Sequence, residues 1–281
     1  MTDQIIINNA QREKAKAFLR MHQTEGMFVI PNAWDAASAY IYENAGFAAV
    51  ATTSAGIAYA LGYPDGEQVP LEDLLFVVKK ITGRVQVPVS VDFERGYAEE
   101  PVQVKENARR LLAVGAVGFN LEDGQADGRL SPLELQIQKI QALCELKKEL
   151  DLPFVINART CAYWLNIGSE EEKLAEAVRR GNAFAEAGAD CVFVPGAMNQ
   201  ETARALVSGI HAPLNLILNG VYHDFAGLAK LGVRRLSTGS GPARFLCEET
   251  IKMAEKIKGG DVDAVLQSTF SYAKANAFFQ K

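Results

Sequence analysis

Acidic side chains recur where short apolar runs of the sequence end, and their spacing suits the binding of a hard metal ion. Asp92, Glu94 and Glu122 close such runs, and Asp65 lies in the loop that follows an earlier one. Because Asp92 and Glu94 are two residues apart, their side chains point the same way on an extended segment. Carboxylates this close raise one another's pKa unless a cation neutralises them, and oxygen ligands without His or Cys favour Mg²⁺ or Mn²⁺. Each acid alone is an ordinary helix cap, but their coincidence at successive strand ends predicts a divalent metal site.

A positive side chain, Arg159, ends the next apolar run. Its guanidinium can hold a substrate carboxylate through two parallel hydrogen bonds, or it can form a salt bridge with a neighbouring acid. The three histidines are poorer candidates for catalysis, because His22 and His211 lie before strands and not after them. His223 lies beyond the seventh expected strand together with Asn219, which we count among the candidate substrate-binding residues.

The elements that position these residues alternate between helix and strand. A glycine precedes a short apolar run at Gly46, Gly115, Gly188 and Gly232, as expected where a helix ends in a left-handed residue and a strand begins. Strands are predicted near residues 28, 48, 88, 118, 154, 191, 215 and 235. Eight strand–helix units predict an α/β fold, the (β/α)8 TIM-type barrel, with its active site at the carboxyl ends of the strands.

Helix signals fill the spaces between these strands and extend beyond them. Capping boxes predict helix starts at 131–134 and 169–172, and extra helices are expected at 11–22 and 262–279. No linker rich in Pro, Gly or Ser divides the chain, so we expect one barrel domain over 1–281 with a helical extension from about residue 243 to 281. Its aromatic residues favour a contact between subunits. An open doubly wound sheet is the alternative, but the G-x-G-x-x-G turn that it needs is missing.

Charge and composition exclude several classes of partner. With 29 basic and 34 acidic residues the formal charge is −5, and basic residues cluster only in pairs, so we expect no nucleic acid partner. No stretch has the roughly 18 apolar residues of a membrane span, and residues 1–20 lack the apolar segment of a signal peptide. We therefore expect a cytoplasmic protein with no membrane partner. The four cysteines are far apart, which is typical of reduced thiols.

Five motifs lie at the predicted strand ends: Pro31–Asp35, Thr52–Gly56, Val91–Tyr97, Asn120–Asp123 and Asn157–Thr160. Together they resemble the isocitrate lyase/phosphoenolpyruvate mutase superfamily, over about residues 31–241. The resemblance implies an α/β barrel, Mg²⁺, a 2-oxo acid or its enolate in the site, and tetramers that exchange the last barrel helix. It further implies that Asp92 contacts the metal directly, while three other acids hold metal-bound waters: Asp65, Glu94 and Glu122.

The same resemblance implies how a substrate is held. Thr53, Ser54 and Ala55 match the loop whose backbone amides and hydroxyl hold the substrate's oxygens, so Thr53 and Ser54 are candidate catalytic residues. Arg159 matches the arginine that binds the substrate carboxylate, and we count it as catalytic too. Asp92 completes the candidate substrate-binding set.

The loop after the fourth strand departs from the family pattern. Lyases that cleave isocitrate or methylisocitrate resemble one another in a Lys-Lys-Cys-Gly-His segment, whereas residues 123–130 contain neither Cys nor His. The lysine and asparagine of phosphoenolpyruvate mutase are missing as well. The remaining pattern resembles the α-oxocarboxylate lyase-like members. Cys161, where relatives commonly carry Asp, either contacts substrate or is a small buried residue.

These observations predict a Mg²⁺-dependent lyase that cleaves a carbon–carbon bond of a small 2-oxo or 2-hydroxy di- or tricarboxylate through an enolate. Methylisocitrate lyase and oxaloacetate-type activities both fit this description. One alternative is a phosphonopyruvate hydrolase or phosphoenolpyruvate phosphonomutase. Another is a non-catalytic oxo-acid binding protein. In each case we expect a small carboxylate as ligand and a homo-oligomer, either a dimer or a tetramer.

Overall fold

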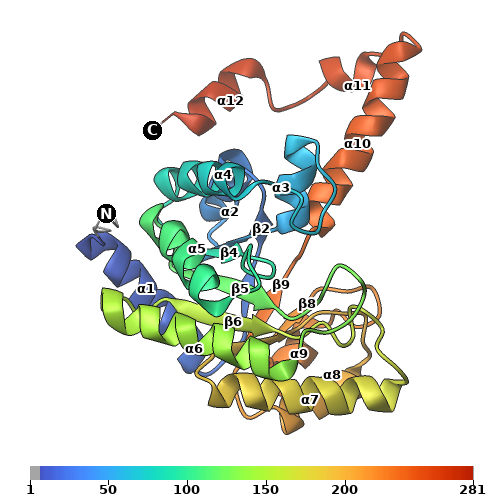
Figure 1. Ribbon diagram of the computed structural model, residues 1–281. Helices are drawn as coiled ribbons and strands as arrows, with labels where there is room; N and C mark the ends of the chain where they lie inside the picture. The colour runs from blue at the N-terminus through green and yellow to red at the C-terminus, as the bar shows by residue number, and fades with distance from the viewer. Residues whose placement is uncertain (1–6, 281) are drawn as a thin grey trace. The chain divides into compact units, whose positions relative to one another are not determined.

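The computed structural model describes residues 7–280, which fall into two compact units: the first ends at Gly239 and the second begins at Ser240. The first unit contains a nine-stranded parallel sheet surrounded by helices (Figure 1). The strands are β1 (Phe28–Ile30), β2 (Asn32–Ala33), β3 (Val50–Thr52), β4 (Val89–Asp92), β5 (Gly118–Glu122), β6 (Val155–Arg159), β7 (Cys191–Val194), β8 (Leu214–Ile217) and β9 (Arg235–Ser237).

The two ends of this sheet meet, so that it forms a barrel. The strand order is β1-β9-β8-β7-β6-β5-β4-β3-β2, and only Pro31 separates β1 from β2 along the chain. β1 pairs with β9 and β2 pairs with β3, so the two short segments together act as the first barrel strand. Pro31 has no amide hydrogen to donate to the ladder, although its carbonyl still accepts a hydrogen bond from the Ala51 amide. The predicted (β/α)8 TIM-type barrel is confirmed, with its first strand in two parts.

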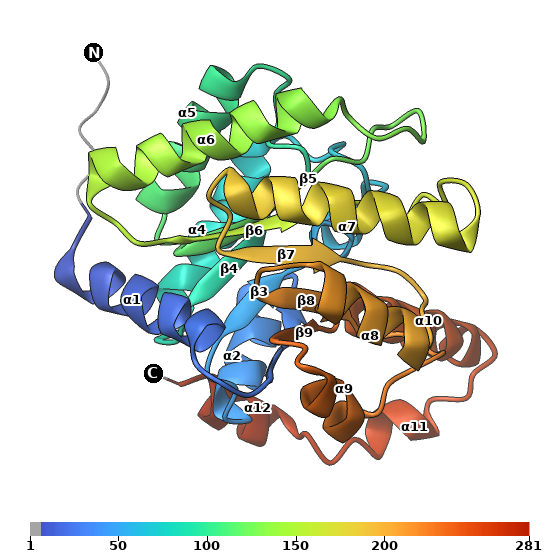
Figure 2. The same cartoon turned by 90° about the horizontal axis from the view of Figure 1, so that it is seen from below.

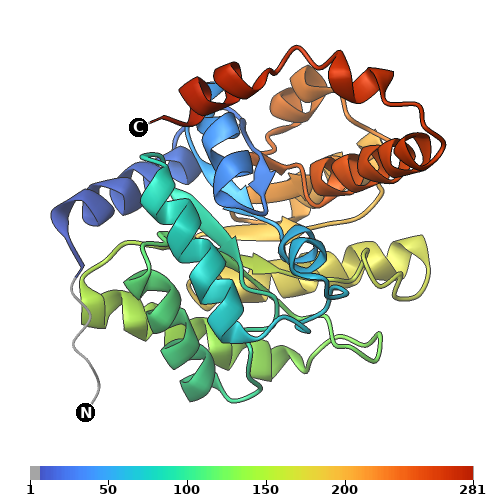
Figure 3. The ribbon, with the colours of Figure 1, turned by 90° about the horizontal axis from the view of Figure 1, so that it is seen from above.

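Helices follow the strands and cover the outer face of the sheet (Figures 2 and 3). In the first unit they are α1 (Asn9–Gln23), α2 (Ala36–Asn44), α3 (Ser54–Leu61), α4 (Leu71–Arg84), α5 (Pro101–Ala113), α6 (Leu133–Leu150), α7 (Glu170–Glu186), α8 (Gln200–Gly209) and α9 (Phe225–Leu231). The four predicted junction glycines all have φ between 90° and 107°, a region that side chains with a Cβ rarely adopt. The predicted helix-to-strand turns are therefore confirmed.

The two predicted capping boxes have different outcomes. Ser169 caps α7 as predicted, because it accepts a hydrogen bond from the Glu172 amide while the Glu172 side chain binds the Ser169 amide. The prediction for Ser131 is wrong. Pro132 has an extended backbone and itself occupies the capping position of α6, so Ser131 lies one residue too far out. Its buried hydroxyl has no hydrogen-bond partner among residues 7–280.

Alternation along the strands decides which side chains enter the barrel. Val91, Leu121 and Ala158 are fully buried in the apolar core between the sheet and its helices. Their neighbours in sequence point to the opposite face, which is the barrel interior. Register then aligns Glu122 with Arg159 at the ends of β5 and β6. The interior of the barrel therefore carries polar side chains that end at the carboxyl edge of the sheet.

Aromatic packing closes the amino ends of the strands. Phe18 and His22 of α1 form edge-to-face contacts with each other and with Phe28 of β1. A Cβ on Gly118 would lie 2.9 Å from the Phe18 ring, so α1 packs directly against β5. We call this group, together with the buried Arg235 of β9, the barrel floor.

The second unit consists of α10 (Gly241–Lys258), α11 (Asp263–Leu266) and α12 (Tyr272–Phe279). The continuous helix predicted over 262–279 is interrupted, because Ser271 accepts a hydrogen bond from the Lys274 amide and starts a new helix. Large apolar side chains of this unit are exposed, including Phe245, Ile251 and Phe270. None of the helices searched within residues 7–280 has the length and apolar character to cross a membrane.

Candidate active site

A cavity of about 150 Å³ lies where the carboxyl ends of β3 to β6 meet. Its polar lining includes five of the residues that the sequence singled out: Ser54, Asp65, Glu94, Glu122 and Arg159. We call these five the mouth cluster. Trp164 and Leu165 supply an apolar part of the wall. The structure thus brings together side chains from four separate loops.

Asp92, the last residue of β4, lies next to this cavity but is not among its lining residues. Its Oδ2 accepts a hydrogen bond from the Ser54 amide at 3.2 Å, and its Oδ1 accepts one from Asn120 Nδ2 at 3.4 Å. Both bonds are long, and they orient the carboxylate without neutralising its charge. Asp92 is therefore held in place, and within residues 7–280 no basic side chain forms an ion pair with it.

Mutual repulsion and burial raise the pKa values of the acids around Asp92. Burial is the first cause for Glu94, whose pKa rises to about 9, and the charge of Asp92 is the second. The same two causes, in the same order, raise the pKa of Asp65. A group of carboxyls that resist ionisation in this way is what a divalent cation would relieve.

Arg159 and Glu122 form an ion pair at the ends of their register-paired strands, with Nη1 2.7 Å from Oε2. Burial raises the pKa of Glu122 to about 7, against the opposing effect of Arg159. The guanidinium lies 5.5 Å from the ring of Trp164, which covers one side of it. Arg159 Nε is buried and has no hydrogen-bond partner in residues 7–280. Arg159 therefore retains a donor for a second carboxylate, one that a ligand in the cavity could bring.

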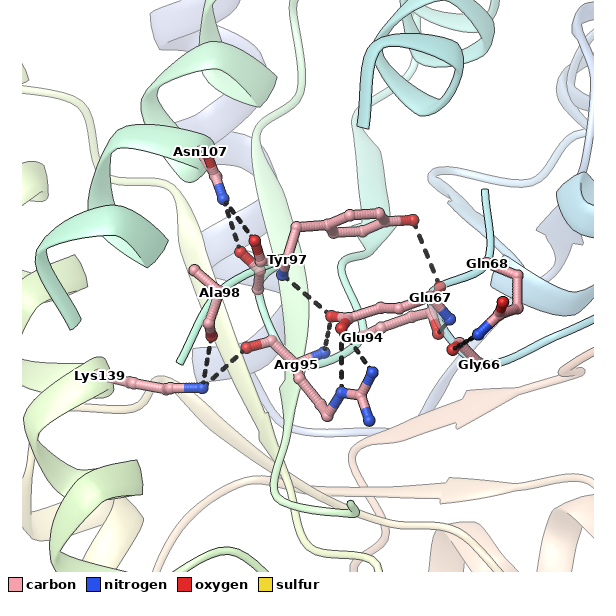
Figure 4. Close-up of polar contacts among 10 residues, drawn as sticks. Gly66, Glu67, Gln68, Glu94, Arg95, Tyr97, Ala98, Asn107 and Lys139 are labelled. Atoms are coloured by element: carbon pink, nitrogen blue, oxygen red, sulfur yellow. Dashed lines mark hydrogen bonds and ion pairs between the residues drawn. The ribbon is translucent and has the colours of Figure 1, made fainter. Parts of the chain in front are cut away.

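Glu67, which sequence reasoning missed, ties the loop of Asp65 to the loop of Glu94 (Figure 4). Its Oε1 accepts hydrogen bonds from the backbone amides of Arg95 and Tyr97, at 2.8 and 2.9 Å. Its Oε2 accepts two more from the Arg95 side chain, at 3.0 and 2.7 Å. In return the Glu67 amide donates to Glu94 Oε2 at 2.5 Å. We call this set of contacts the Glu67 clamp.

The clamp holds a strained stretch of backbone. Glu67, Glu94 and Tyr97 have φ values of 60°, 51° and 55°, which is unusual for residues with a Cβ. Such conformations persist only where surrounding contacts enforce them, and they gather at functional sites. Lys139 adds support from α6, because its buried ammonium donates to the carbonyls of Arg95 and Ala98 (Figure 4). The sequence held one indication of a role for Glu67, because it follows the candidate ligand Asp65 by two residues. Its hydrogen-bond partners, however, lie in a loop that is distant in the sequence.

The predicted substrate-holding loop forms the start of α3. Thr53 is its capping residue and accepts a hydrogen bond from the Gly56 amide, so its hydroxyl is already engaged. Ser54 and Ala55 occupy the first turn, where amide hydrogens lack partners inside the helix. Ser54 lines the cavity, whereas Thr53 and Ala55 are buried beside it. Amides at a helix start favour anionic ligands, which suits a carboxylate.

Asn219 lies apart from this cluster. Its Oδ1 accepts hydrogen bonds from the amides of Val221 and Tyr222, and its Nδ2 donates to the carbonyl of Ile217. All of its polar atoms thus shape its own loop, and it is not among the residues that line the cavity. A role in substrate binding stays a prediction for Asn219. His223 is exposed in the same loop.

A buried ion pair behind the cavity also escaped the sequence reasoning. Asp123 lies 3.1 Å from Arg180 of α7, and both side chains are almost completely buried. The other oxygen of Asp123 accepts a hydrogen bond from the Cys161 amide at 2.7 Å. Cys161 is 1% exposed, lines the cavity, and lies 3.8 Å from Glu122 through its Sγ. Cys161 is therefore a small buried residue next to the site, and its contact with substrate stays a prediction.

The mouth cluster suits a hard cation by its chemistry and charge. Its oxygens come from three carboxyls with raised pKa values, and Asp92 adds a fourth carboxylate beside them. Within residues 7–280, however, no three His, Cys, Asp or Glu side chains are arranged to hold an ion directly. Contact through water, as expected for all but Asp92, needs no such cage. The metal assignments stay predictions on this structure.

Comparison with known proteins places the chain among lyases and mutases. Residues 18–258 match the profile of a family described as phosphoenolpyruvate phosphomutase. An uncharacterised protein of Mycobacterium tuberculosis is 34% identical over 227 residues, covering 80% of this chain and 83% of its own. A 2-methylisocitrate lyase of Halalkalibacterium halodurans is 28% identical over 240 residues, covering 83% and 73%.

Solved structures give the same picture of the fold. A protein of Burkholderia cenocepacia J2315, described as a candidate lyase/mutase, superimposes with a TM-score of 0.89 at 30% identity. The superposition covers 96% of this chain and 98% of that one. A phosphonopyruvate hydrolase solved with oxalate and Mg²⁺ superimposes with a TM-score of 0.81 at 23% identity, covering 94% of each chain. At that identity, the second likeness supports the fold alone.

Proposed function

Because the chain belongs to the phosphoenolpyruvate phosphomutase family, as its motifs led us to expect, we propose that it is a Mg²⁺-dependent carbon–carbon lyase. Its substrate would be a small 2-oxo or 2-hydroxy di- or tricarboxylate. One observation carries this proposal: Arg159 and three carboxyl side chains line the same cavity. The guanidinium can bind the substrate's carboxylate, and the carboxyls can bind the metal.

The residues that would hold the metal are Asp92, directly, and three acids through water: Asp65, Glu94 and Glu122. When bound, Mg²⁺ would supply positive charge beside the substrate's carboxylate and adjacent oxygen. The Glu67 clamp fixes Glu94 and Arg95 and so keeps the acid loops in register before any ligand arrives. Preorganisation of this kind removes the cost of ordering the site during the reaction.

Arg159 would orient the substrate, and the start of α3 would stabilise the charge that develops on it. When the carbon–carbon bond of a 2-oxo acid breaks, the electron pair stays on the oxo acid fragment as an enolate, which then takes up a proton. In a 2-hydroxy acid the hydroxyl loses its proton and becomes the carbonyl of the oxo acid, while the electron pair moves to the other fragment as an enolate that is protonated in turn. Ser54 lines the cavity beside Asp92, where its hydroxyl could donate to an oxygen that gains charge. Trp164 shields the guanidinium from solvent and thereby strengthens its hold on a carboxylate.

A panel of substrates tests the proposal. The purified protein would receive 2-oxo acids and four- to seven-carbon hydroxy acids with Mg²⁺, and release of pyruvate or glyoxylate would be measured. Arg159→Lys, which keeps the charge but not the planar fork, is the matched control and should lose most of the activity. Oxalate binding without turnover of any compound would contradict the lyase proposal and support a non-catalytic oxo-acid binding protein.

Phosphonopyruvate hydrolase or phosphonomutase activity is the second candidate, because the matching family profile bears the mutase's name. Supplying phosphonopyruvate and oxaloacetate in parallel separates the two. Phosphate release or phosphoenolpyruvate formation from the first compound alone would favour carbon–phosphorus chemistry. The loop at 123–130, which lacks Lys, Cys and His, gives no support to it.

We also propose that the protein is a homo-oligomer, either a dimer or a tetramer. The support is the second unit, whose helices leave Phe245, Leu246 and Ile251 exposed. Light scattering coupled to gel filtration measures the mass directly, and a monomer at micromolar concentration would contradict this proposal. A cytoplasmic location stays a prediction.

A further inference from the structure

Arg235 of β9 is a buried charge without a counter-ion in the described chain. Its side chain is 0% exposed and is among the largest fully buried side chains of the protein. None of its three guanidinium nitrogens, Nε, Nη1 and Nη2, has a hydrogen-bond partner within residues 7–280. The ring of Phe18 lies against it, with the ring centroid 5.7 Å from Cζ. A single aromatic face covers one side of a guanidinium and accepts none of its in-plane hydrogens.

The groups around Arg235 cannot supply the missing negative charge. The Cys191 thiol lies on β7, on the far side of β8, and burial raises its pKa to about 12, so it is neutral near pH 7. Burial and the charges of two arginines lower the pKa of His22 to about 3, so this imidazole is neutral as well. Burial lowers the pKa of Arg235 itself to about 10, which still leaves it charged. Asp92 acts on Arg235 only at a distance, without an ion pair.

Asn215 adds a further donor on the adjacent strand. β8 and β9 pair in register at Asn215 and Arg235, so their side chains share the interior face of the barrel. Asn215 Oδ1 accepts a hydrogen bond from Ser237 Oγ at 3.1 Å. Its Nδ2 is a donor, and it too is buried without a partner in residues 7–280. Four buried donor nitrogens on two neighbouring residues thus carry one net positive charge.

We propose that the barrel floor holds a small monovalent anion against the guanidinium of Arg235 and the amide of Asn215. Every unpaired atom of these two residues is a donor, so the ligand must be an acceptor. A buried ion without a partner is strongly unfavourable, and water supplies hydrogen bonds but no charge. One anionic charge balances the one cation, and the complete burial of Arg235 favours a ligand as small as a halide or a one-carbon carboxylate.

Crystals of the intact protein grown or soaked with bromide test the site directly. We expect an anomalous difference peak within hydrogen-bond distance of the Arg235 guanidinium. A one-carbon carboxylate such as formate, retained there from the cell and resisting bromide, would support the same site with its other occupant. Ordered waters alone at this position would overturn the proposal.

Thermal unfolding tests the same site in solution. After exhaustive dialysis into sodium gluconate, whose anion is too bulky to enter, we expect Tm to rise by about 5 °C when chloride replaces gluconate at constant ionic strength. Arg235→Met should abolish this response. Arg179→Met, which removes a half-exposed guanidinium from α7, should retain it. If Arg235→Met does not fold, Arg235→Lys should keep the response while weakening the apparent affinity for chloride. An identical chloride response in the Arg235 and Arg179 variants would overturn the proposal.

Discussion

The two ends of the barrel treat charge in opposite ways. At the mouth, four carboxyls gather near Arg159 and Arg95, and burial and repulsion keep the pKa values of three of them high. At the floor, a single buried cation lies among aromatic rings that pack α1 against the strands. The mouth therefore gives up stability for the ability to bind a metal and a substrate, whereas the floor contributes to the stability of the barrel. The comparison teaches that substitutions at the two ends should separate activity from stability.

The largest effect is expected at Asp92. Asp92→Asn should reduce turnover by at least about 10³-fold, because it removes the one acid proposed to contact the metal directly. In EDTA the same variant should be as stable as the wild type or more stable by about 0.5–2 kcal/mol, since Asp92 helps to raise the pKa of Asp65 and Glu94. Kinetics and urea denaturation measure the two effects. Full activity in Asp92→Asn would reject the site, and Asp127→Asn on an exposed loop is the control.

Arg159 should come next. Arg159→Lys is expected to lower kcat/KM by about 10²- to 10³-fold, because an ammonium cannot replace two parallel hydrogen bonds to a carboxylate. The loss should fall mainly on KM if Arg159 binds the ground state and transition state equally. Steady-state kinetics with a monocarboxylate substrate and a dicarboxylate substrate would show how the loss divides between KM and kcat. An equal loss for compounds with and without that carboxylate would argue that Arg159 serves only as the partner of Glu122.

At the floor the expectation is reversed. Phe18→Ala should lower the free energy of unfolding by about 3–5 kcal/mol, because Phe18 is fully buried between α1, β1 and β5. Its kcat should stay close to that of the wild type at temperatures where the variant is folded. Urea denaturation and initial rates measure these quantities. A large fall in kcat in the folded variant would break the division between mouth and floor.

The Glu67 clamp should give a smaller effect at the mouth. Glu67→Gln keeps the size of the side chain but loses the ion pair with Arg95 and one of its acceptors. By analogy with partners of metal ligands, we expect Mg²⁺ affinity to fall by about 10- to 100-fold. Calorimetric titration with Mg²⁺ measures it without reference to turnover. Glu171→Gln, the same change at an exposed position of α7, should leave the affinity unchanged.

The last effect concerns the metal-free protein alone and is a pH dependence of its stability. The pKa of Glu94 is raised from 4.5 to about 9 in the folded state, so the folded protein binds more protons than the unfolded chain between these values. Stability that is fully present below pH 4.5 should therefore be lost as the pH rises towards 9. Denaturation midpoints in EDTA across this range should fall, and Glu94→Gln should flatten the curve. Midpoints that rise with pH would contradict the raised pKa.

Local signals in the sequence were sufficient for most of the fold. Gly188 and Gly232 mark the ends of helices because only glycine adopts their backbone conformation cheaply, and Ser169 with Glu172 forms a box within one helical turn. Ser131 misled because a proline can either begin a helix or stand just outside it. The split of the first strand at Pro31 depends on pairing with β9 and β3, which no local window contains.

The site shows the same limit. Asp65, Glu94, Glu122 and Arg159 were predicted to meet because strand ends converge in any barrel of this class, and the cavity contains all four. Glu67 was missed because its partners lie in another loop and are largely backbone amides, which leave no mark on side-chain composition. Arg235 was missed for a related reason. Two consecutive arginines predict an exposed segment, and only the pairing of Arg235 with Asn215 of β8 shows that its side chain lies inside the barrel.

The pairing of β1 with β9 has a consequence for synthesis of the protein. β1 can pair with β9 only when residues near Ser237 have left the ribosome. Until then β1 and β8 present open edges, whose free amides and carbonyls invite strands of other chains. At about 5–20 residues per second this interval lasts on the order of ten seconds or more for every new copy. Protection of nascent chains during that interval, more than the stability of the finished ring, should govern the yield of protein in a cell.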